Sequence, residues 1–112
     1  MANILTQSRK EKLDYLIKLD KAYVECHWDY DRDCEYKRTK SLNRNVKILN
    51  AIQKKTEQVW GQLMKSFKVE RQWDLPREVH EYYENGRRNN CYDRFNNFER
   101  DLQRLGVKLP KQ

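Results

Sequence analysis

Six basic residues in the middle of the chain recur at intervals that place them along one side of a helix. Apolar residues recur on the opposite side, as in a helix with one face on a core and the other in solvent. Lysine and arginine neutralise phosphates and release counterions when they bind a nucleic-acid backbone. We therefore interpret this basic stripe, which would span about 42 Å of helix, as a nucleic-acid interface formed by Lys37, Lys40, Arg44, Lys47, Lys54 and Lys65.

The net charge of +7 comes almost entirely from the middle third of the chain. Residues 37–68 hold nine Lys and Arg against one acid, Glu57, for a net charge of +8. Residues 1–36 have a net charge of −2, and residues 69–112 have a net charge of +1. A surface this locally cationic indicates an anionic partner, which is nucleic acid (DNA or RNA), an acidic protein or an anionic membrane. A membrane is disfavoured, because the core needs the apolar face of the helix.

Two further arginines follow Asn85 and Gly86, a dipeptide that commonly ends helices. A short helix, a turn over residues 85–88 and a final helix have the outline of a helix-turn-helix. In this interpretation Arg87 and Arg88 stand at the front of a recognition helix as a second nucleic-acid contact, with Asn89, Asn90, Tyr92 and Arg94 beside them. The alternative is an ordinary helical hairpin that caps a bundle.

An acidic and aromatic segment precedes the basic stripe at residues 25–36. Its three alternating aspartates match the first ligands of a calcium loop, but Cys34 and Lys40 replace the glycine and glutamate that complete such a loop. We predict instead an acidic patch, which either pairs with neighbouring basic residues or faces a partner protein. The predicted partner-binding residues are Asp29, Asp31, Asp33 and Trp73.

The three cysteines, Cys26, Cys34 and Cys91, are an odd number without CxxC spacing. Cys26, His27 and Cys34 lack a fourth zinc ligand at a usual spacing. The beginning of the chain has no apolar run of signal-peptide length. We predict a cytoplasmic protein with reduced thiols and no metal or cofactor. Because we find no catalytic motif, and because His80 among Glu78, Glu81 and Glu84 fits no nuclease pattern, we predict that it is not an enzyme.

The elements that position these residues are helices. No Gly or Pro occurs before Gly61, while Leu, Lys, Glu and Gln are abundant, and a length of 112 residues suits a single domain over 1–112. We predict an all-α fold with a long antiparallel hairpin, residues 8–36 and 41–69, in preference to one continuous rod. A Ser8–Glu11 capping box would begin it. A shorter C-terminal helical hairpin, residues 76–85 and 89–105, completes the fold. Trp60 is expected in the core and Trp73 at the surface.

Two functions are consistent with these features. The first is a non-catalytic nucleic-acid-binding protein, or an accessory subunit of a nucleic-acid-processing complex, that contacts the phosphate backbone through the basic stripe. The second is a small protein-binding adaptor or inhibitor, of the kind that phages and mobile elements encode, which occupies a partner protein's site.

Overall fold

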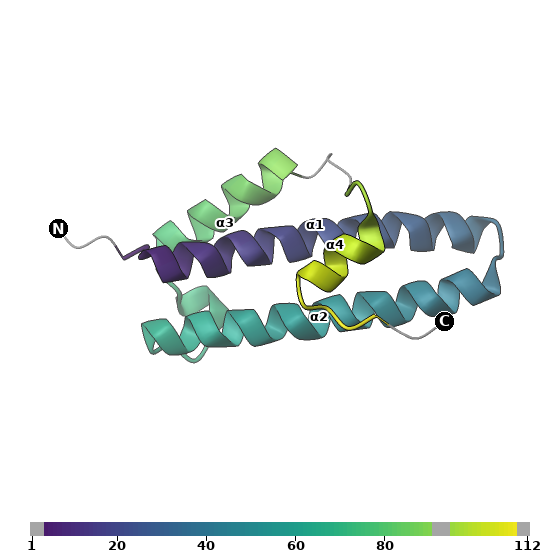
Figure 1. Cartoon of the computed structure of the whole chain (residues 1–112). Helices are drawn as coiled ribbons and strands as arrows, with labels where there is room; N and C mark the ends of the chain where they lie inside the picture. Colours follow the sequence, from purple (N-terminus) through teal and green to yellow (C-terminus); the bar gives the residue numbers. More distant parts are fainter. Residues whose placement is uncertain (1–3, 91–94, 110–112) are drawn as a thin grey trace.

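Two long helices form from the first two thirds of the chain, where no helix breaker interrupts a strong apolar repeat. The computed structural model describes residues 4–90 and 95–109. In it, α1 (Gln7–Glu35) and α2 (Thr39–Phe67) run antiparallel, side by side (Figure 1). The described residues contain four α-helices and no strand. The predicted all-α class and long hairpin are therefore confirmed.

The start of α1 differs from the predicted capping box. Thr6 is the N-cap, and its hydroxyl accepts a hydrogen bond from the Arg9 amide at 3.3 Å. Ser8 lies inside the first turn, where its hydroxyl accepts from the Lys12 ammonium at 3.0 Å. The prediction of Ser8 as the cap was wrong, because Thr and Ser cap helices almost equally well and the earlier residue also fits.

Polar contacts join the two helices at both ends of the hairpin. At the turn, Lys37 adopts the left-handed conformation with φ of 56°, and the buried Asp33 carboxylate accepts a hydrogen bond from the Asn45 amide at 2.9 Å. At the open end, Arg9 donates to the Ser66 hydroxyl at 2.9 Å and to the Ser66 carbonyl at 3.0 Å. These contacts hold α1 and α2 in one register.

One hydrophobic cluster draws residues from all four helices. Trp60 is in this core, 6% exposed, whereas Trp73 in the 3₁₀ helix η1 (Gln72–Asp74) is 71% exposed. Both predictions for these tryptophans are confirmed. No helix within residues 4–90 and 95–109 has the length and apolar character needed to cross a bilayer. The fully buried large side chains are Leu13, Leu16, Leu19, Ile52, Leu63, Leu102, Val79 and Cys26.

The third helix, α3 (Arg77–Asn90), continues through the position where the sequence predicted its end. Gly86 lies inside α3, at the place where this helix packs against Ile17 of α1. A Cβ atom at Gly86 would stand 2.2 Å from Ile17 Cδ1. The glycine therefore permits close packing of two helices and does not terminate one. The predicted bounds of 76–85, and the helix-turn-helix turn over 85–88, were wrong for this reason.

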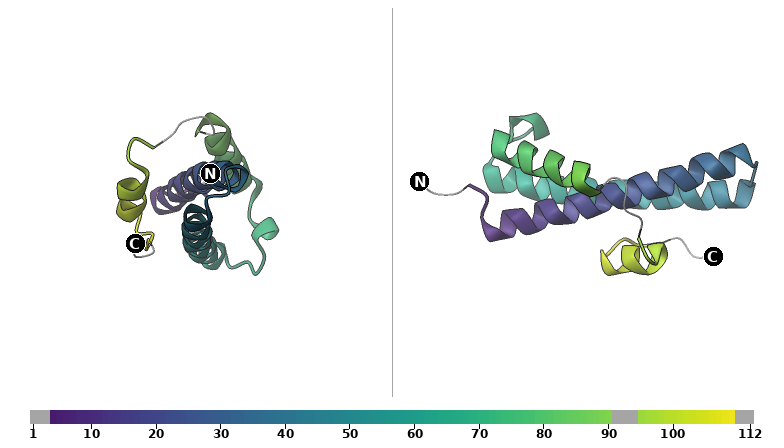
Figure 2. Two further views of the ribbon diagram at one scale, coloured as in Figure 1. Left: turned by 90° about the vertical axis from the view of Figure 1, so that its right-hand side faces the viewer. Right: turned by 90° about the horizontal axis from the view of Figure 1, so that it is seen from above.

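The last helix, α4 (Phe98–Arg104), is shorter than the predicted 89–105. Asn97 caps it by accepting a hydrogen bond from the Arg100 amide at 3.1 Å. Before the cap, the buried Glu25 carboxylate accepts from the Phe95 amide at 3.0 Å, which holds the preceding segment on α1. Helices α3 and α4 flank the long hairpin on different sides (Figure 2). Cys91, Tyr92 and Arg94, which the sequence places in the last predicted helix, lie outside the described residues.

Candidate nucleic-acid interface

Four lysines of the basic stripe form a straight array on the outer face of α2, which we call the lysine row: Lys40, Lys47, Lys54 and Lys65. All four are exposed. They are separated by seven, seven and eleven residues, close to whole numbers of helical turns, and cover about 37 Å of helix. The buried residues of the same helix, Ile48, Ile52, Val59, Trp60 and Leu63, provide its core contacts. Packing of this apolar face against the core leaves the lysine row in solvent.

The other two members of the basic stripe have different environments. Lys37 lies in the turn between α1 and α2, before the helix begins. Arg44 is half-buried, and its guanidinium forms an ion pair with Glu99 of α4. Arg44 therefore fastens α4 to the hairpin. At this edge of the basic stripe, a basic residue contributes to packing between helices.

The acidic segment of α1 does not neutralise the lysine row. Asp29 is 3.5 Å from Arg32, and Asp31 is 3.3 Å from the His27 ring nitrogen, both on the same helix. Asp33 is buried against Asn45 at the hairpin turn. Among the described residues, none of the four row lysines has an ion pair with a carboxylate. The row keeps its full positive charge.

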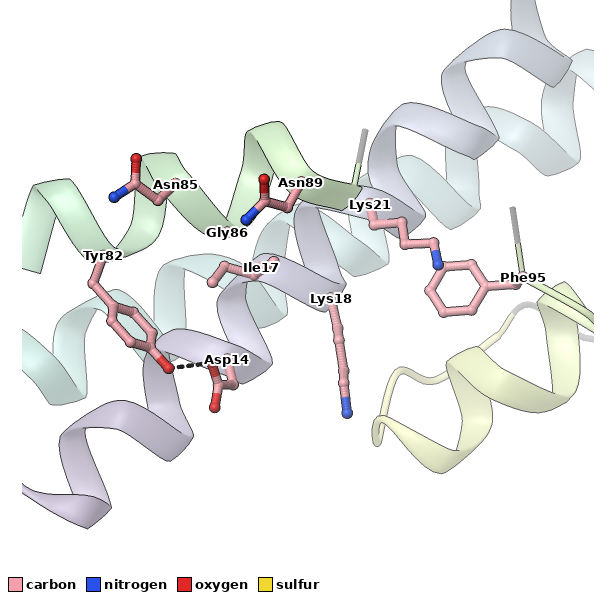
Figure 3. Close-up of a pocket in the computed structure, with 9 residues that line it drawn as sticks. All are labelled: Asp14, Ile17, Lys18, Lys21, Tyr82, Asn85, Gly86, Asn89 and Phe95. Carbon is pink, nitrogen blue, oxygen red and sulfur yellow. Dashed lines mark hydrogen bonds between the residues drawn. The ribbon is translucent and has the colours of Figure 1, made fainter. Parts of the chain in front are cut away.

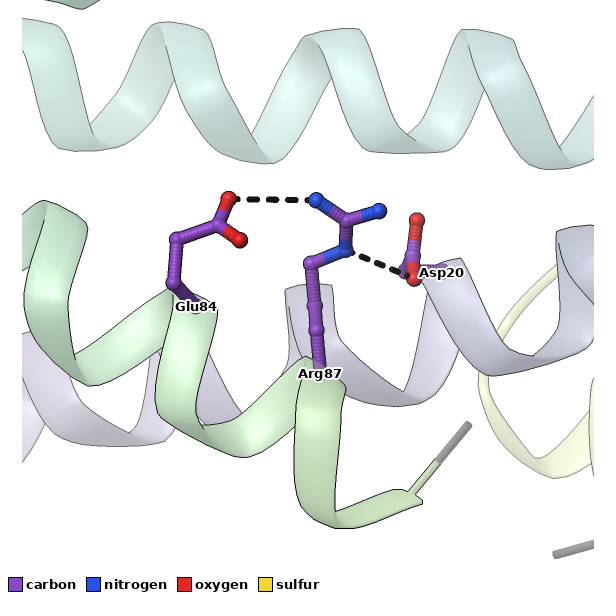
Figure 4. A network of polar contacts seen from close by, with 3 residues as sticks. All are labelled: Asp20, Glu84 and Arg87. Carbon is purple, nitrogen blue, oxygen red and sulfur yellow. Dashed lines mark hydrogen bonds and ion pairs between the residues drawn. The ribbon is translucent and has the colours of Figure 1, made fainter. Parts of the chain in front are cut away.

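The predicted second nucleic-acid contact, Arg87 and Arg88, lies within α3. Arg87 is held between two carboxylates, 3.0 Å from Asp20 of α1 and 3.1 Å from Glu84 (Figure 4). Its positive charge is therefore balanced within the fold, and it fixes α3 on α1. Arg88 is exposed on the same helix. The structure thus joins neither arginine to the lysine row.

A cavity of about 360 Å³ opens beside the lysine row, where the segment after α4 crosses α2. We call it the tail cavity. Among the described residues, three lysines line it and no Asp or Glu does. Sequence reasoning missed Lys55 and Lys108, because they are half a chain apart and only the fold brings them together. The described residues of the lining are Ala51, Lys54, Lys55, Gln58, Gly106, Val107 and Lys108.

The segment that closes the tail cavity is firmly anchored. Gly106 adopts φ of +81°, a conformation that favours glycine. The Val107 amide donates to the Leu102 carbonyl at 3.1 Å, and the Val107 side chain is 4% exposed. The Tyr15 hydroxyl of α1 donates to the Leu105 carbonyl. Lys108 therefore follows a backbone that is fixed against α4 and α1.

A larger cavity, about 540 Å³, lies between α1 and α3 (Figure 3). Two of its polar side chains, Tyr82 and Lys21, make contacts between segments that pack together. The Tyr82 hydroxyl donates to Asp14 at 2.7 Å, and this hydrogen bond raises the pKa of Tyr82, so the phenol stays a donor. Lys21 lies over the Phe95 ring, 4.7 Å from its centre. This cavity has mixed charge and lacks the one-sided cationic character of the α2 face.

The thiol and imidazole groups do not assemble into a reactive site within the described residues. Burial, followed by the charges of Asp29 and Glu25, raises the pKa of Cys26 to about 12, so its thiol is inert at neutral pH. His27 is exposed beside Asp31. No three His, Cys, Asp or Glu side chains of residues 4–90 and 95–109 come together as a metal-binding group.

The residues predicted for a partner protein do not form one surface. Asp29 and Asp31 lie towards the turn of the hairpin, whereas Trp73 follows the end of α2 at the opposite end (Figure 1). Asp33 is 4% exposed and bonded to Asn45, so it is not part of an accessible patch. Burial of its carboxylate was not visible in the sequence, where it alternates with the half-buried Asp29 and the exposed Asp31.

Comparison of the chain with protein-family models, with curated proteins and with solved structures finds no significant match. Functional inference therefore rests on the geometry of the α2 face.

Proposed function

We propose that this protein binds nucleic acid without catalysis, as an accessory factor, and that the lysine row contacts the phosphate backbone. One observation carries the proposal: four exposed ammonium groups follow one face of a helix, and none is ion-paired within the described residues. Lysine contacts of this kind bind phosphates with little sequence preference.

The residues between the lysines favour nucleic acid over a protein partner. Apart from Glu57, one turn after Lys54, the exposed side chains on and beside this face are neutral amides, Asn43, Asn50, Gln58 and Gln62. Amides donate hydrogen bonds to phosphate and sugar oxygens. Protein interfaces need buried aromatic or apolar anchors at their centre. The most exposed aromatic side chains, Tyr36 and Trp73, are in the two connections at the ends of α2, away from the row.

Fluorescence anisotropy with labelled duplex DNA, single-stranded DNA and single-stranded RNA tests the proposal across a salt series. The informative variant is Lys40→Gln/Lys47→Gln, which removes two row contacts outside the tail cavity. Its matched control is Lys10→Gln/Lys18→Gln, which removes the same charge from α1. Circular dichroism of each variant checks that the helices are retained.

The magnitude follows from counterion release. If each row lysine neutralises one phosphate, the log–log slope on duplex is about −3.6, and affinity falls about 150-fold between 50 and 200 mM salt. On a single strand the slope is about −2.8 and the loss is about 50-fold. The row variant should reduce the duplex slope by about 1.8, while the control leaves it near the wild-type value. Equal effects of the two variants would show that net charge, and not the row, governs binding.

The alternative function, a protein-binding adaptor or inhibitor, is favoured by one observation. Trp73 is 71% exposed, and the Arg71 guanidinium carbon lies 5.4 Å from its ring centre. Tryptophan and arginine are the residues most enriched at energetic centres of protein interfaces. Under this alternative, nucleic acid does not bind at physiological salt, and Trp73→Ala, unlike the row variant, abolishes association with the partner.

A further inference from the structure

We propose that the tail cavity holds a single phosphate group and so fixes one point of the bound strand on α2. This inference rests on the proposed function and deepens it. The starting observation is that, within the part of the chain that the structure describes, Lys54, Lys55 and Lys108 line one cavity and no Asp or Glu lines it with them. Like charges brought close together destabilise a fold unless an anion compensates them. An anion bound among these three lysines would offset their mutual repulsion.

The cavity is preorganised for such an anion. Lys54 and Lys55 come from a helix whose opposite side is buried, and Lys108 follows the anchored Val107. The Lys55 ammonium is 3.8 Å from where a Cβ of Gly106 would be, so it already lies beside the tail backbone. The backbone that carries these lysines is fixed in advance and loses little freedom on binding, and this favours affinity.

The chemistry of the lining selects phosphate. Lysine ammoniums and the Gln58 amide approach from two segments, which suits a tetrahedral anion that accepts hydrogen bonds in several directions. The Gly106 and Val107 amides already donate to Gln103 and Leu102, so side chains are the donors. Lys54 belongs to both the tail cavity and the lysine row, so a strand that follows the row passes over the cavity.

The phosphate could be an internal diester of the strand, its terminal monoester or free inorganic phosphate. All three present the same oxygen acceptors, and a monoester carries close to two negative charges at neutral pH. The inference is that one phosphate group is shared by the lysines of the cavity, Lys54 included, in contrast to the other row lysines, each of which meets its own phosphate.

This contrast gives a quantitative test with Lys54→Gln/Lys55→Gln/Lys108→Gln, which removes all three cavity lysines, including the one that belongs to the lysine row. Removal of one shared phosphate should reduce the duplex salt slope by about 0.9 and the affinity at 0.15 M salt by about fivefold. Removal of two separate contacts, as in Lys40→Gln/Lys47→Gln, should reduce the slope by about 1.8. A slope loss of about 1.8 or more in the cavity variant, or no loss, overturns the inference while the row result still supports the proposed function.

A second readout does not require nucleic acid. Inorganic phosphate, added against chloride at equal ionic strength, should shift the backbone amide NMR signals of Gly106 and Val107 in the wild type and not in Lys54→Gln/Lys55→Gln/Lys108→Gln. These shifts without any nucleic-acid binding would support the site and reject the proposed function. Their absence together with an unchanged slope would reject the site.

Oligonucleotides with a 5′-phosphate or a 5′-hydroxyl identify the source of the phosphate. A preference for the phosphorylated end that disappears in the cavity variant supports the site and assigns it to the terminal monoester. Equal binding of both oligonucleotides, with the fivefold loss in the cavity variant, supports the site and assigns it to an internal phosphate.

Discussion

The two helical glycines, Gly86 and Gly61, give opposite predictions for the same substitution. A Cβ atom at Gly86 would lie 2.2 Å from Ile17 Cδ1 and 2.9 Å from Ile17 Cγ1, whereas nothing lies within 4 Å of a Cβ at Gly61. Ile17 is 6% exposed and branched at Cβ, so it has little freedom to move aside. Alanine should therefore be tolerated at position 61 and should overpack the contact with Ile17 at position 86.

The effect of helix propensity on stability can be separated from the effect of overpacking, because both glycines are inside helices. Replacing a helical glycine with alanine gains about 1 kcal/mol from backbone propensity at either site. Overpacking a buried contact costs about 1–3 kcal/mol. Gly61→Ala should raise the free energy of unfolding by about 1 kcal/mol, and Gly86→Ala should fall below Gly61→Ala by about 1–3 kcal/mol.

Urea unfolding followed by circular dichroism at 222 nm measures both variants, with the m-value as a check on two-state behaviour. A glycine that ends a helix also resists alanine, so the double variant Gly86→Ala/Ile17→Val distinguishes the two causes. Trimming Ile17 should recover part of the loss if α1 and α3 pack closely there. The close packing of these helices would be refuted if Gly86→Ala were as stable as Gly61→Ala. It would also be refuted if adding Ile17→Val did not reduce the loss of stability.

Three other consequences of the structure can be measured. Asp33→Ala should lower the free energy of unfolding by about 1–3 kcal/mol, because the Asn45 amide loses its acceptor, whereas Asp31→Ala on the exposed side changes it by less than about 0.5 kcal/mol; equal urea midpoints would contradict the burial of Asp33. Iodoacetamide at pH 8 should label the exposed Cys34 in the folded protein and Cys26 only after unfolding, and peptide mass spectrometry that finds Cys26 labelled in the folded state would contradict this. Because burial raises the pKa of Cys26 from 9.0 to about 12, the unfolded thiol loses its proton first, so stability should decline as pH rises above 9; a Cys26→Ala variant whose urea midpoint declines equally between pH 8 and 10 would exclude this cause.

The sequence was sufficient for features that depend on local periodicity. A helix fixes the direction of every side chain relative to its neighbours, so the spacing of Lys40, Lys47, Lys54 and Lys65 places them on one face before any tertiary contact is known. The same argument puts Trp60 on the core side of α2. The hairpin was preferred over a rod because two apolar stripes each need a partner, and α1 and α2 provide it for one another.

Tertiary structure decided the features for which the local sequence allows a residue two different structural roles. Glycine after asparagine can end a helix or admit a neighbouring one, and the contact of Gly86 with Ile17 decides between them. A basic residue can face solvent or bind a carboxylate, and Arg87 meets Asp20 only because α3 packs on α1. The cationic lining of the tail cavity arises in the same way, because Lys55 and Lys108 are distant in sequence and meet only when the segment after α4 crosses α2. Periodicity gives the direction of a side chain on its own helix, whereas its partner on another segment depends on long-range packing.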